Sequence, residues 1–276
     1  MKYTHSSLLY VFKNIWYIGL LSLLPAFCLS SVADVEYTKE FFVNFFAGNL
    51  NQMEWLHIFH TFSIYCFTGV VPLVLDVFSF LSVVVCASML LALIDKHMRI
   101  GKRTLNGLWN KVNDNITSTF FAALFFSLIY EIWALVFSSL TYAIFALIPI
   151  LSVQYVLFAI LLIGGGLALL YVVSLFYLWL PCMQITGFEM FEALRYSNQM
   201  TERVKIRIMA SMALSLVIGS TFIILSAVFF PAPVLYAVMF VVFMFYFMLF
   251  LVRMEVIYFD AAQLEREDLK KHYAQF

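Results

Sequence analysis

The segment FLSVVVCASMLLALI, residues 80–94, and the segment VLYAVMFVVFMFYFMLFLV, residues 234–252, decide the fold class of this chain. Neither segment contains a charged residue, and apolar side chains fill almost every position. A strand of a membrane β-barrel alternates apolar and polar residues over about ten positions. A membrane-spanning helix instead needs about 20 consecutive, mostly apolar residues. The two segments therefore predict membrane-spanning α-helices.

The composition of the whole chain supports this interpretation. Of its 276 residues, 64% are hydrophobic and 12% are charged, whereas a soluble domain has about 25% charged residues. Lipid must therefore cover most of the surface, and in lipid only helices and closed barrels pair all their backbone polar groups. We predict an all-α polytopic membrane helix bundle that forms a single integral membrane domain over residues 1–276. Its six predicted spans cover residues 14–33, 64–94, 117–148, 153–181, 207–230 and 234–258.

Basic residues are distributed unequally between the two sides of these spans. They precede span one, lie between spans two and three and between spans four and five, and accompany the end of span six: Lys2, Lys13, Lys96, Arg99, Lys102, Arg103, Lys111, Arg195, Arg203, Lys205, Arg207, Arg253, Arg266, Lys270 and Lys271. Only Lys39 remains for the other side. Cytoplasmic loops are enriched in lysine and arginine. We therefore expect both termini in the cytoplasm, and a multi-pass protein of the cell membrane, specifically the bacterial cytoplasmic membrane.

Three segments near the first two spans allow more than one interpretation. Residues 57–94 are too long for one straight span, but two crossings would place a lysine-rich loop outside. We therefore predict an interfacial piece and then one helix that bends at Pro72, because proline removes a helix hydrogen bond. Asp76 would then lie near the outer headgroups.

The crowded aromatic side chains of residues 34–61 predict an outer interfacial segment. Residues 31–33 resemble a signal-peptide cleavage site, but in a polytopic chain we expect a retained helix.

Two inner loops have similar sequences. Gly101 and Gly187 each follow the end of a span, and apolar residues recur four and seven positions later. Glycine just beyond a helix end is a stop signal, and the apolar spacing suits a helix that lies along the membrane surface. We predict cytoplasmic amphipathic elbows at 98–113 and 184–204. Because both copies would start on the same side, the pattern indicates an internal parallel repeat, with chance similarity between two membrane loops as the alternative.

The end of span four and the second elbow carry a recognisable pattern. WLPCM, residues 179–183, ends the span, Gly187 follows, and the amphipathic stretch EALRYS occupies residues 192–197. This pattern resembles a group of bacterial six-helix integral membrane proteins that includes the membrane domain of glycerophosphoryl diester phosphodiesterases and many uncharacterised relatives. The resemblance implies a six-helix architecture. It implies no phosphodiesterase activity, because the sequence contains no phosphodiesterase domain.

Glu131 is the strongest candidate for a functional side chain. It lies within an apolar run that we predict to span the membrane, where a central carboxylate costs about 2.5–3.5 kcal/mol on insertion scales. Ser127 lies one turn before it, and Ser138 and Tyr142 lie two and three turns after it on the same helix face. One interpretation is a site for a proton, a cation or a substrate. The other is a hydrogen-bonded glutamate that holds two helices together.

Three consecutive glycines, Gly164, Gly165 and Gly166, lie within span four. Small residues let membrane helices approach closely. Glycine also weakens a helix, and a break there would expose backbone carbonyls, as in transporters with discontinuous helices. We favour close packing of helices.

Motifs that would indicate an enzyme are absent from the sequence. It has no glycine-rich phosphate loop, no zinc-protease motif and no serine-hydrolase motif. Glu54, His57 and His60 have a spacing that zinc sites use, but their aromatic surroundings favour ordinary interfacial side chains. We therefore expect no catalytic residues, no metal, no cofactor and no nucleic-acid partner.

The predicted function is that of a non-catalytic integral membrane protein, a scaffold, assembly factor or accessory component. Its expected partners are the lipid bilayer and another membrane protein. The alternative is a small secondary transporter in which Glu131 acts on a small-molecule substrate. The alternative would explain an intramembrane carboxylate, consecutive glycines and a parallel repeat.

Overall fold

The computed structural model describes residues 2–66, 69–101 and 107–270, and helices are the only regular secondary structure in these ranges. In chain order, the helices are α1 (Lys2–Lys13), α2 (Ile15–Val32), α3 (Val35–Ala47), the 3-10 turn η1 (Leu50–Gln52), α4 (Trp55–Phe62), α5 (Val70–Ile100), α6 (Leu108–Leu147), α7 (Leu151–Phe176), α8 (Trp179–Thr186), α9 (Met190–Glu202), α10 (Lys205–Phe229), α11 (Ala232–Ala261) and α12 (Glu267–Lys270).

The prediction of an all-helical membrane bundle with six spans is confirmed over the described residues. The stretches long and apolar enough to cross a membrane are Ile15–Val32, Val70–Ile100, Trp109–Leu147, Leu151–Thr186, Lys205–Phe229 and Ala232–Ala261. The second span was expected at 64–94 and the third at 117–148, so both extend further toward their shared loop than predicted. Asp95, Arg99 and Lys111 consequently belong to helices rather than to a loop.

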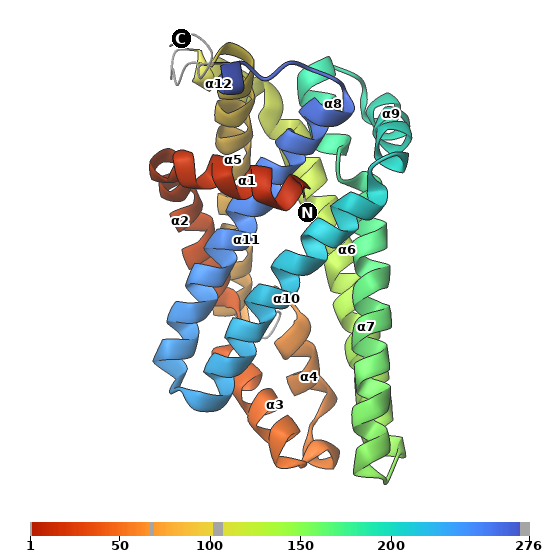
Figure 1. The fold of residues 1–276 in the computed structure, drawn as a ribbon. Helices are drawn as coiled ribbons and strands as arrows, with labels where there is room; N and C mark the ends of the chain where they lie inside the picture. The colour runs from red at the N-terminus through yellow and green to blue at the C-terminus, as the bar shows by residue number, and fades with distance from the viewer. Residues whose placement is uncertain (1, 67–68, 102–106, 271–276) are drawn as a thin grey trace.

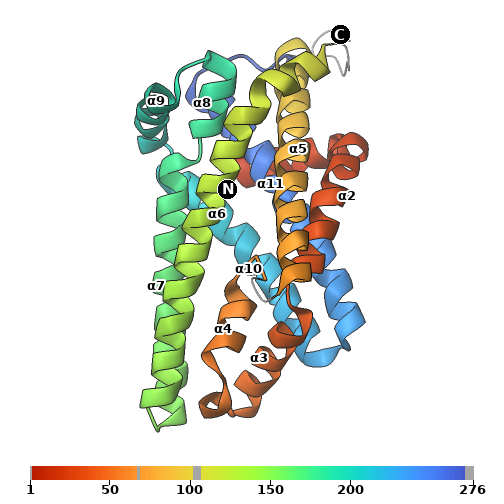
Figure 2. The same cartoon turned by 180° about the vertical axis from the view of Figure 1, so that it is seen from behind.

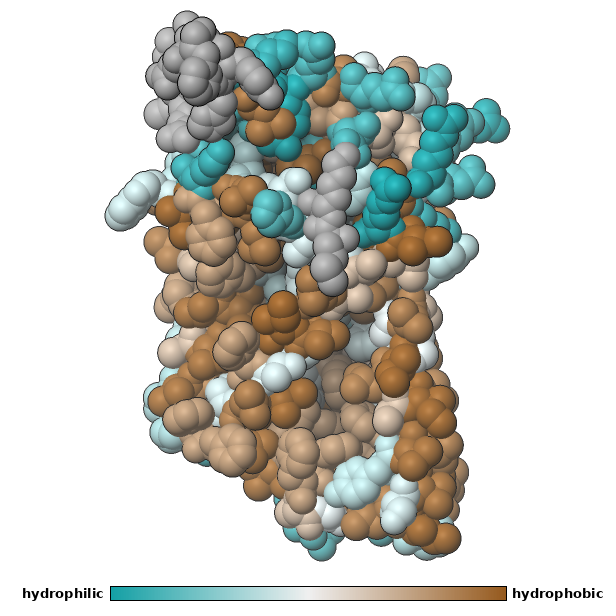
Figure 3. Space-filling view, in the orientation of Figure 1, coloured by the Kyte–Doolittle hydropathy of each residue, from teal (hydrophilic) through white to brown (hydrophobic). Residues whose placement is uncertain are grey.

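The six spans form two groups. Figures 1 and 2 show α6 and α7 as a long hairpin beside the group of α2, α5, α10 and α11, with α3 and α4 between the two groups at one end of the molecule. We call the end with Arg99, Lys111, Arg195 and Arg266 the basic end, and the end with α3 and α4 the opposite end. Figure 3 shows hydrophilic residues gathered at the basic end above a broad hydrophobic belt. This distribution is that of a membrane-embedded surface.

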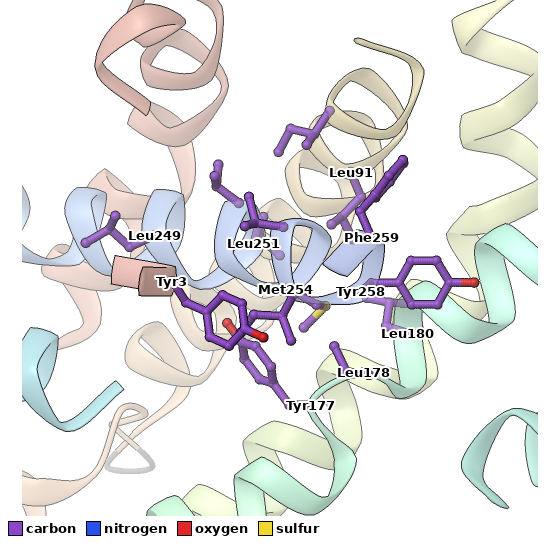
Figure 4. Packing of buried hydrophobic residues seen from close by; sticks show 14 of the residues in the cluster. Tyr3, Leu91, Tyr177, Leu178, Leu180, Leu249, Leu251, Met254, Tyr258 and Phe259 are labelled. Carbon is purple, nitrogen blue, oxygen red and sulfur yellow. The ribbon is translucent and has the colours of Figure 1, made fainter. Parts of the chain in front are cut away.

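The largest buried cluster surrounds the C-terminal half of α11, near the basic end. Figure 4 shows side chains that follow α7 and begin α8, among them Tyr177 and Leu180, packed beside Met254 and Tyr258. The Tyr177 hydroxyl donates a 2.7 Å hydrogen bond to the backbone oxygen of Phe250. In a bilayer, such packing and hydrogen bonds replace the hydrophobic drive that holds soluble cores together.

Helix α1 was not predicted, and it crosses the bundle at the boundary between the hydrophilic and hydrophobic regions. Tyr3 anchors it to α11, because its hydroxyl donates a 2.7 Å hydrogen bond to Asp260 Oδ2. Burial, and then the neighbouring Asp260 carboxylate, raise the pKa of Tyr3 to about 12. The hydroxyl therefore stays a donor at neutral pH.

The segment predicted as an outer interfacial segment, 34–61, forms α3, η1 and most of α4, which pack against α6 and α7. Asp34 caps α3 by accepting a 3.0 Å hydrogen bond from the Tyr37 backbone N–H, and Gly48 ends the helix in the left-handed conformation. Its aromatic side chains join a second buried cluster with α6 and α7, formed by Phe41, Leu50, Met53, Ile58, Phe137, Phe145 and Phe158. In α3, Phe41 is buried, Phe42 and Phe45 are partly buried and Phe46 is 61% exposed, so this helix has one packed face and one exposed face.

The second crossing is broken rather than bent. Helix α4 ends at Phe62 and α5 begins at Val70, so Pro72 lies in the first turn of a new helix and not at a bend. Proline is tolerated in a first helical turn because its missing N–H would have no helical partner there. Of the connecting segment, residues 63–66 and 69 are described, and they are not helical.

The two predicted elbows differ. In the second, 184–204, a separate helix α9 buries Ala193, Ser197 and Thr201 along one face. In the first, 98–113, α5 continues to Ile100 and α6 has begun by Leu108, while residues 102–106 lie outside the described ranges. The described part of the first elbow therefore belongs to the two long helices.

The three glycines of span four do not interrupt it, since α7 is continuous from Leu151 to Phe176. A Cβ added to Gly165 would lie 3.1 Å from Phe137 of α6, whereas one added to Gly164 or Gly166 would meet nothing within 4 Å. The Trp133 indole N–H also donates a 2.8 Å hydrogen bond to the Gly165 carbonyl. Close packing of α6 and α7 thus occurs at Gly165, and the two other glycines take no part in it.

Candidate functional site

Glu131 faces the break between α4 and α5. The Ser63 hydroxyl donates a 2.7 Å hydrogen bond to Glu131 Oε2, and the backbone N–H of Ile64 donates a 3.0 Å hydrogen bond to Oε1. Both carboxylate oxygens therefore accept hydrogen bonds from the segment that follows α4. This carboxylate joins α6 to the non-helical part of the second crossing.

The break explains why a carboxylate is needed at this position. Helix α4 ends at Phe62. The backbone N–H of Ser63 still donates a hydrogen bond to the Phe59 carbonyl, but the N–H groups that follow it have no helical carbonyl to bind. Non-helical backbone at membrane depth is tolerated only where protein or enclosed water satisfies it. Glu131 accepts from one of these N–H groups, and the Ser63 hydroxyl accepts from the Tyr65 N–H at 3.2 Å.

Two of the four residues in the predicted polar stripe meet at this junction. Ser127 joins Glu131 there, because its hydroxyl lies 3.3 Å from the hydroxyl of Tyr65. Ser138 is buried elsewhere along α6, and its hydroxyl has no hydrogen-bond partner within the described residues. Tyr142 lies on the exposed surface of the helix. The stripe is therefore a local contact of Glu131 and Ser127 rather than a continuous polar path.

Asp76 is a second carboxylate at the same junction, which the sequence analysis had placed near the outer headgroups. It is 6% exposed, and its Oδ1 accepts a 3.1 Å hydrogen bond from the Cys66 backbone N–H. Its Oδ2, and the buried hydroxyl of Ser79 one turn further along α5, have no hydrogen-bond partner in the described ranges. Asp76 of α5 and Glu131 of α6 thus both accept hydrogen bonds from the non-helical segment between α4 and α5.

A different set of charged side chains lies near the basic end and includes Arg253 and Glu255 of α11. Both are buried, at 2% and 1% exposed. Arg253 Nη2 donates a 2.6 Å hydrogen bond to the Ser215 hydroxyl, but both oxygens of Glu255 lack a hydrogen-bond partner among the described residues. Nearby, Asp95 forms ion pairs with Arg99 and Lys111. Asp95, Arg253 and Glu255 are therefore buried within the bundle, whereas the side chains of Arg99 and Lys111 are partly exposed.

The two sets differ in what they can do chemically. At the junction, the bonded oxygens of Glu131 hold a chain segment, while the second oxygen of Asp76 can still accept a proton or contact a cation. At the basic end, Asp95 is neutralised by two cations and Glu255 by none within hydrogen-bonding distance. Within the described ranges, no group of three or more histidine, cysteine or carboxylate side chains could hold a metal ion.

Sequence reasoning found Glu131 and Ser127 but missed Asp76, Arg253 and Glu255 as buried polar residues. A signal existed for Asp76, since it follows several apolar residues and precedes the uncharged run of 77–94. Arg253 and Glu255 follow the second such run directly. A position at the end of an apolar run indicates the interface equally well, and only the packing of α1, α8 and α10 around α11 buries these two charges.

The chain matches no family model, no curated protein and no solved structure. The function proposed for it rests on the arrangement of its own residues.

Proposed function

We propose that this protein is a non-catalytic component of a membrane assembly, acting as a scaffold or accessory subunit. The observation that carries the proposal is the bonding of Glu131. This carboxylate was the strongest candidate for transport chemistry, and both of its oxygens are occupied by Ser63 and Ile64. A side chain committed in this way stabilises the architecture.

The exposed face of α7 supports the same proposal. Ile160, Ile163, Gly164, Leu167 and Ala168 are exposed and recur at helical spacing, with Gly164 and Ala168 four residues apart. Small residues at this spacing let a second membrane helix approach closely. We propose that a helix of the partner protein packs on this face.

The test is affinity purification of tagged protein from native membranes in mild detergent. A stoichiometric partner should co-purify with the wild type and be lost with Gly164→Leu. Because a Cβ at Gly164 meets nothing within 4 Å, that variant should keep its melting temperature. Gly166→Leu, which is equally free of contacts, is the matched control and should retain the partner. Equal recovery of the partner with Gly164→Leu would contradict the role of this face.

Gly165→Leu separates partner binding from folding. The added side chain would collide with Phe137 and displace Trp133, whose indole binds the Gly165 carbonyl. Overpacking of this kind costs about 1–3 kcal/mol. We expect a lower melting temperature for Gly165→Leu than for Gly164→Leu or Gly166→Leu. An unchanged melting temperature would contradict the close packing of α6 and α7 at this position.

The second candidate function, secondary transport, rests on a different observation. Residues 63–66 and 69, between α4 and α5, are not helical, and Oδ2 of Asp76 beside this break has no hydrogen-bond partner among the described residues. Transporters bind ions at such broken helices. The distinguishing variant is Asp76→Asn, which keeps the size and the acceptor for the Cys66 N–H. If that variant folds normally but reproduces the phenotype of gene deletion, ion-coupled transport becomes the better account.

We also propose that the basic end faces the cytoplasm of a bacterial cell, following the distribution of lysine and arginine. Gln199 at the basic end and Gln52 at the opposite end are both exposed. In a background without the native cysteines, Gln52→Cys should react with a membrane-impermeant thiol reagent in intact cells. Gln199→Cys should react only after permeabilisation. The reverse pattern would overturn this orientation.

A further inference from the structure

A cavity of about 610 Å³ opens beside the corner between α1 and α2, where this corner faces the C-terminal end of α5 and the tail around α12. We propose that this cavity binds the headgroup of a phospholipid that combines a phosphate with a hydrogen-bond donor, as phosphatidylglycerol and phosphatidylethanolamine do. The inference is independent of the proposed function, because neither Glu131 nor α7 contributes to the cavity.

Asn14 supplies the acceptor. It forms the corner itself, lines the cavity and is 3% exposed. Its side-chain Nδ2 donates a 2.9 Å hydrogen bond to the Tyr10 carbonyl, which fixes the orientation of the amide. Its Oδ1 is buried and has no hydrogen-bond partner within the part of the chain that the structure describes. A buried acceptor without a donor costs about 1–3 kcal/mol, and a hydroxyl or ammonium group of a ligand would remove that cost.

Lys13 and Arg266 supply positive charge to the same cavity. Arg266 is held in place by Asp268, with Nη2 to Oδ2 at 2.8 Å and Nε to Oδ1 at 3.2 Å, and it lies over the ring of Tyr10. The phosphate of a headgroup fits beside Lys13 and Arg266. The carboxylate of Asp268 adds a second acceptor, so the cavity offers both cations and acceptors within the space of one headgroup.

The position of the cavity favours a lipid over a soluble phosphate compound. Phe12 and Trp16, which flank the corner, are 59% and 91% exposed, and Leu9 and Leu269 lie at the cavity with much of their surface open. Aromatic side chains gather at the level of the headgroups, and Figures 1 and 3 place α1 at the boundary between the hydrophilic end and the hydrophobic belt. Acyl chains would lie along these apolar side chains.

The experiment measures lipid binding to the full chain in detergent by native mass spectrometry and by lipid-dependent melting temperature. The probes are phosphatidylglycerol, phosphatidylethanolamine and phosphatidylcholine with identical acyl chains. Phosphatidylcholine has the phosphate but no donor, so it should bind about tenfold more weakly, which is the effect of one buried acceptor left unpaired. Equal binding of all three lipids would overturn the proposal.

Two variants assign the recognition to this cavity. Asn14→Leu removes the acceptor and should abolish the preference over phosphatidylcholine. Lys13→Gln should weaken binding of all three lipids while the preference remains, and it tests the site even if Asn14→Leu does not fold. A preference that survives in folded Asn14→Leu, or binding that is unchanged in Lys13→Gln, would contradict the assignment. Glycerol 3-phosphate is the last probe: binding as tight as that of the lipids would show a site for soluble phosphate compounds instead.

Discussion

Glu131 near the middle of α6 and Glu255 near the basic end are both carboxylates of membrane-spanning helices, but their surroundings differ. Glu131 is partly buried and accepts hydrogen bonds at both oxygens, whereas Glu255 is 1% exposed and accepts none within the described residues. The difference follows from the neighbouring backbone. A broken helix beside Glu131 offers free donors, while the continuous helices around Glu255 have already paired theirs. Burial alone therefore does not tell whether a carboxylate stabilises a membrane protein.

The variant with the largest expected effect is Glu131→Leu. It would leave the Ile64 N–H without its acceptor and would remove one of the two acceptors of the Ser63 hydroxyl, which also reaches the Tyr65 carbonyl oxygen at 2.7 Å. A lost partner costs about 1–3 kcal/mol. We expect a strong fall in the free energy of unfolding, measured by denaturation in mixed detergent micelles. Glu131→Gln keeps one carbonyl oxygen and should lose less.

Ile132→Leu is the control for Glu131→Leu, because Ile132 is an exposed apolar neighbour on the same helix. It should leave the unfolding free energy unchanged. A Glu131→Leu protein as stable as this control would contradict the anchoring role.

Asp95→Asn tests the second half of the comparison, since Asp95 is the carboxylate near the basic end that does have partners. The variant removes the charge that pairs with Arg99 and Lys111. Their side chains are 43% and 34% exposed, so water screens the lost attraction and we expect a loss of about 1 kcal/mol or less. The same denaturation measurement checks this, and a loss as large as that of Glu131→Leu would show that ion pairs near the basic end matter as much as the junction.

Glu255→Gln should change stability still less. The direction of the change in melting temperature shows whether Glu255 has no partner or binds a cation. A buried carboxylate without partners gains little from its charge, and replacing such a group by a neutral one is often neutral or stabilising. We expect an unchanged or higher melting temperature. A clear destabilisation would show that Glu255 binds a cation in the membrane and would remove the contrast with Glu131.

The smallest expected effect is a pH dependence at His60 of α4, which lies outside the six spans. Its Nε2 is buried and has no hydrogen-bond partner among the residues that the structure describes. Burial lowers the pKa of His60, Asp34 partly opposes this shift, and the charge of His57 adds to it. The unfolded chain therefore binds a proton more readily than the folded protein, so stability falls as the pH drops below the ordinary imidazole value of about 6.5.

The measurement for His60 is the melting temperature between neutral pH and the pH at which the protein ceases to fold reversibly. As the pH falls, the melting temperature of His60→Gln should decrease less than that of the wild type. His57→Gln is the matched control, since the His57 ring also stacks on Tyr37 but is more exposed. An identical pH profile for wild type and His60→Gln would contradict this assignment.

Local sequence identified single positions of interest but not their contacts. Glu131 was expected either to form a site for a proton, a cation or a substrate or to hold two helices together; it contacts Ser63 and Ile64 of the non-helical segment after α4, and both interpretations stay predictions. Gly165 was expected to allow close packing, and it does, while its two glycine neighbours do not. Three identical residues in a row carry no information about which one faces the neighbouring helix.

The break before Val70 could not be predicted in the same way. Residues 63–69, SIYCFTG, mix polar and apolar side chains without a clear end signal for α4, and Pro72 indicated a bend at least as well as a start. The break is stabilised by Glu131 from α6 and by Asp76, and the first of these is distant in the chain. A segment leaves the helical conformation in lipid only when such distant groups bind its backbone.

Apolar runs and the positions of the charged residues were sufficient to predict six membrane-spanning helices, because the cost of placing polar groups in lipid acts on each segment separately. Which faces of those helices meet was decided by contacts between distant segments. The packing of α3 and α4 between the two groups of spans, the burial of Glu255 and the cavity at Asn14 all depend on side chains from three or more helices. In a bilayer every surface of these helices is apolar, so hydropathy does not distinguish a face covered by protein from one covered by lipid.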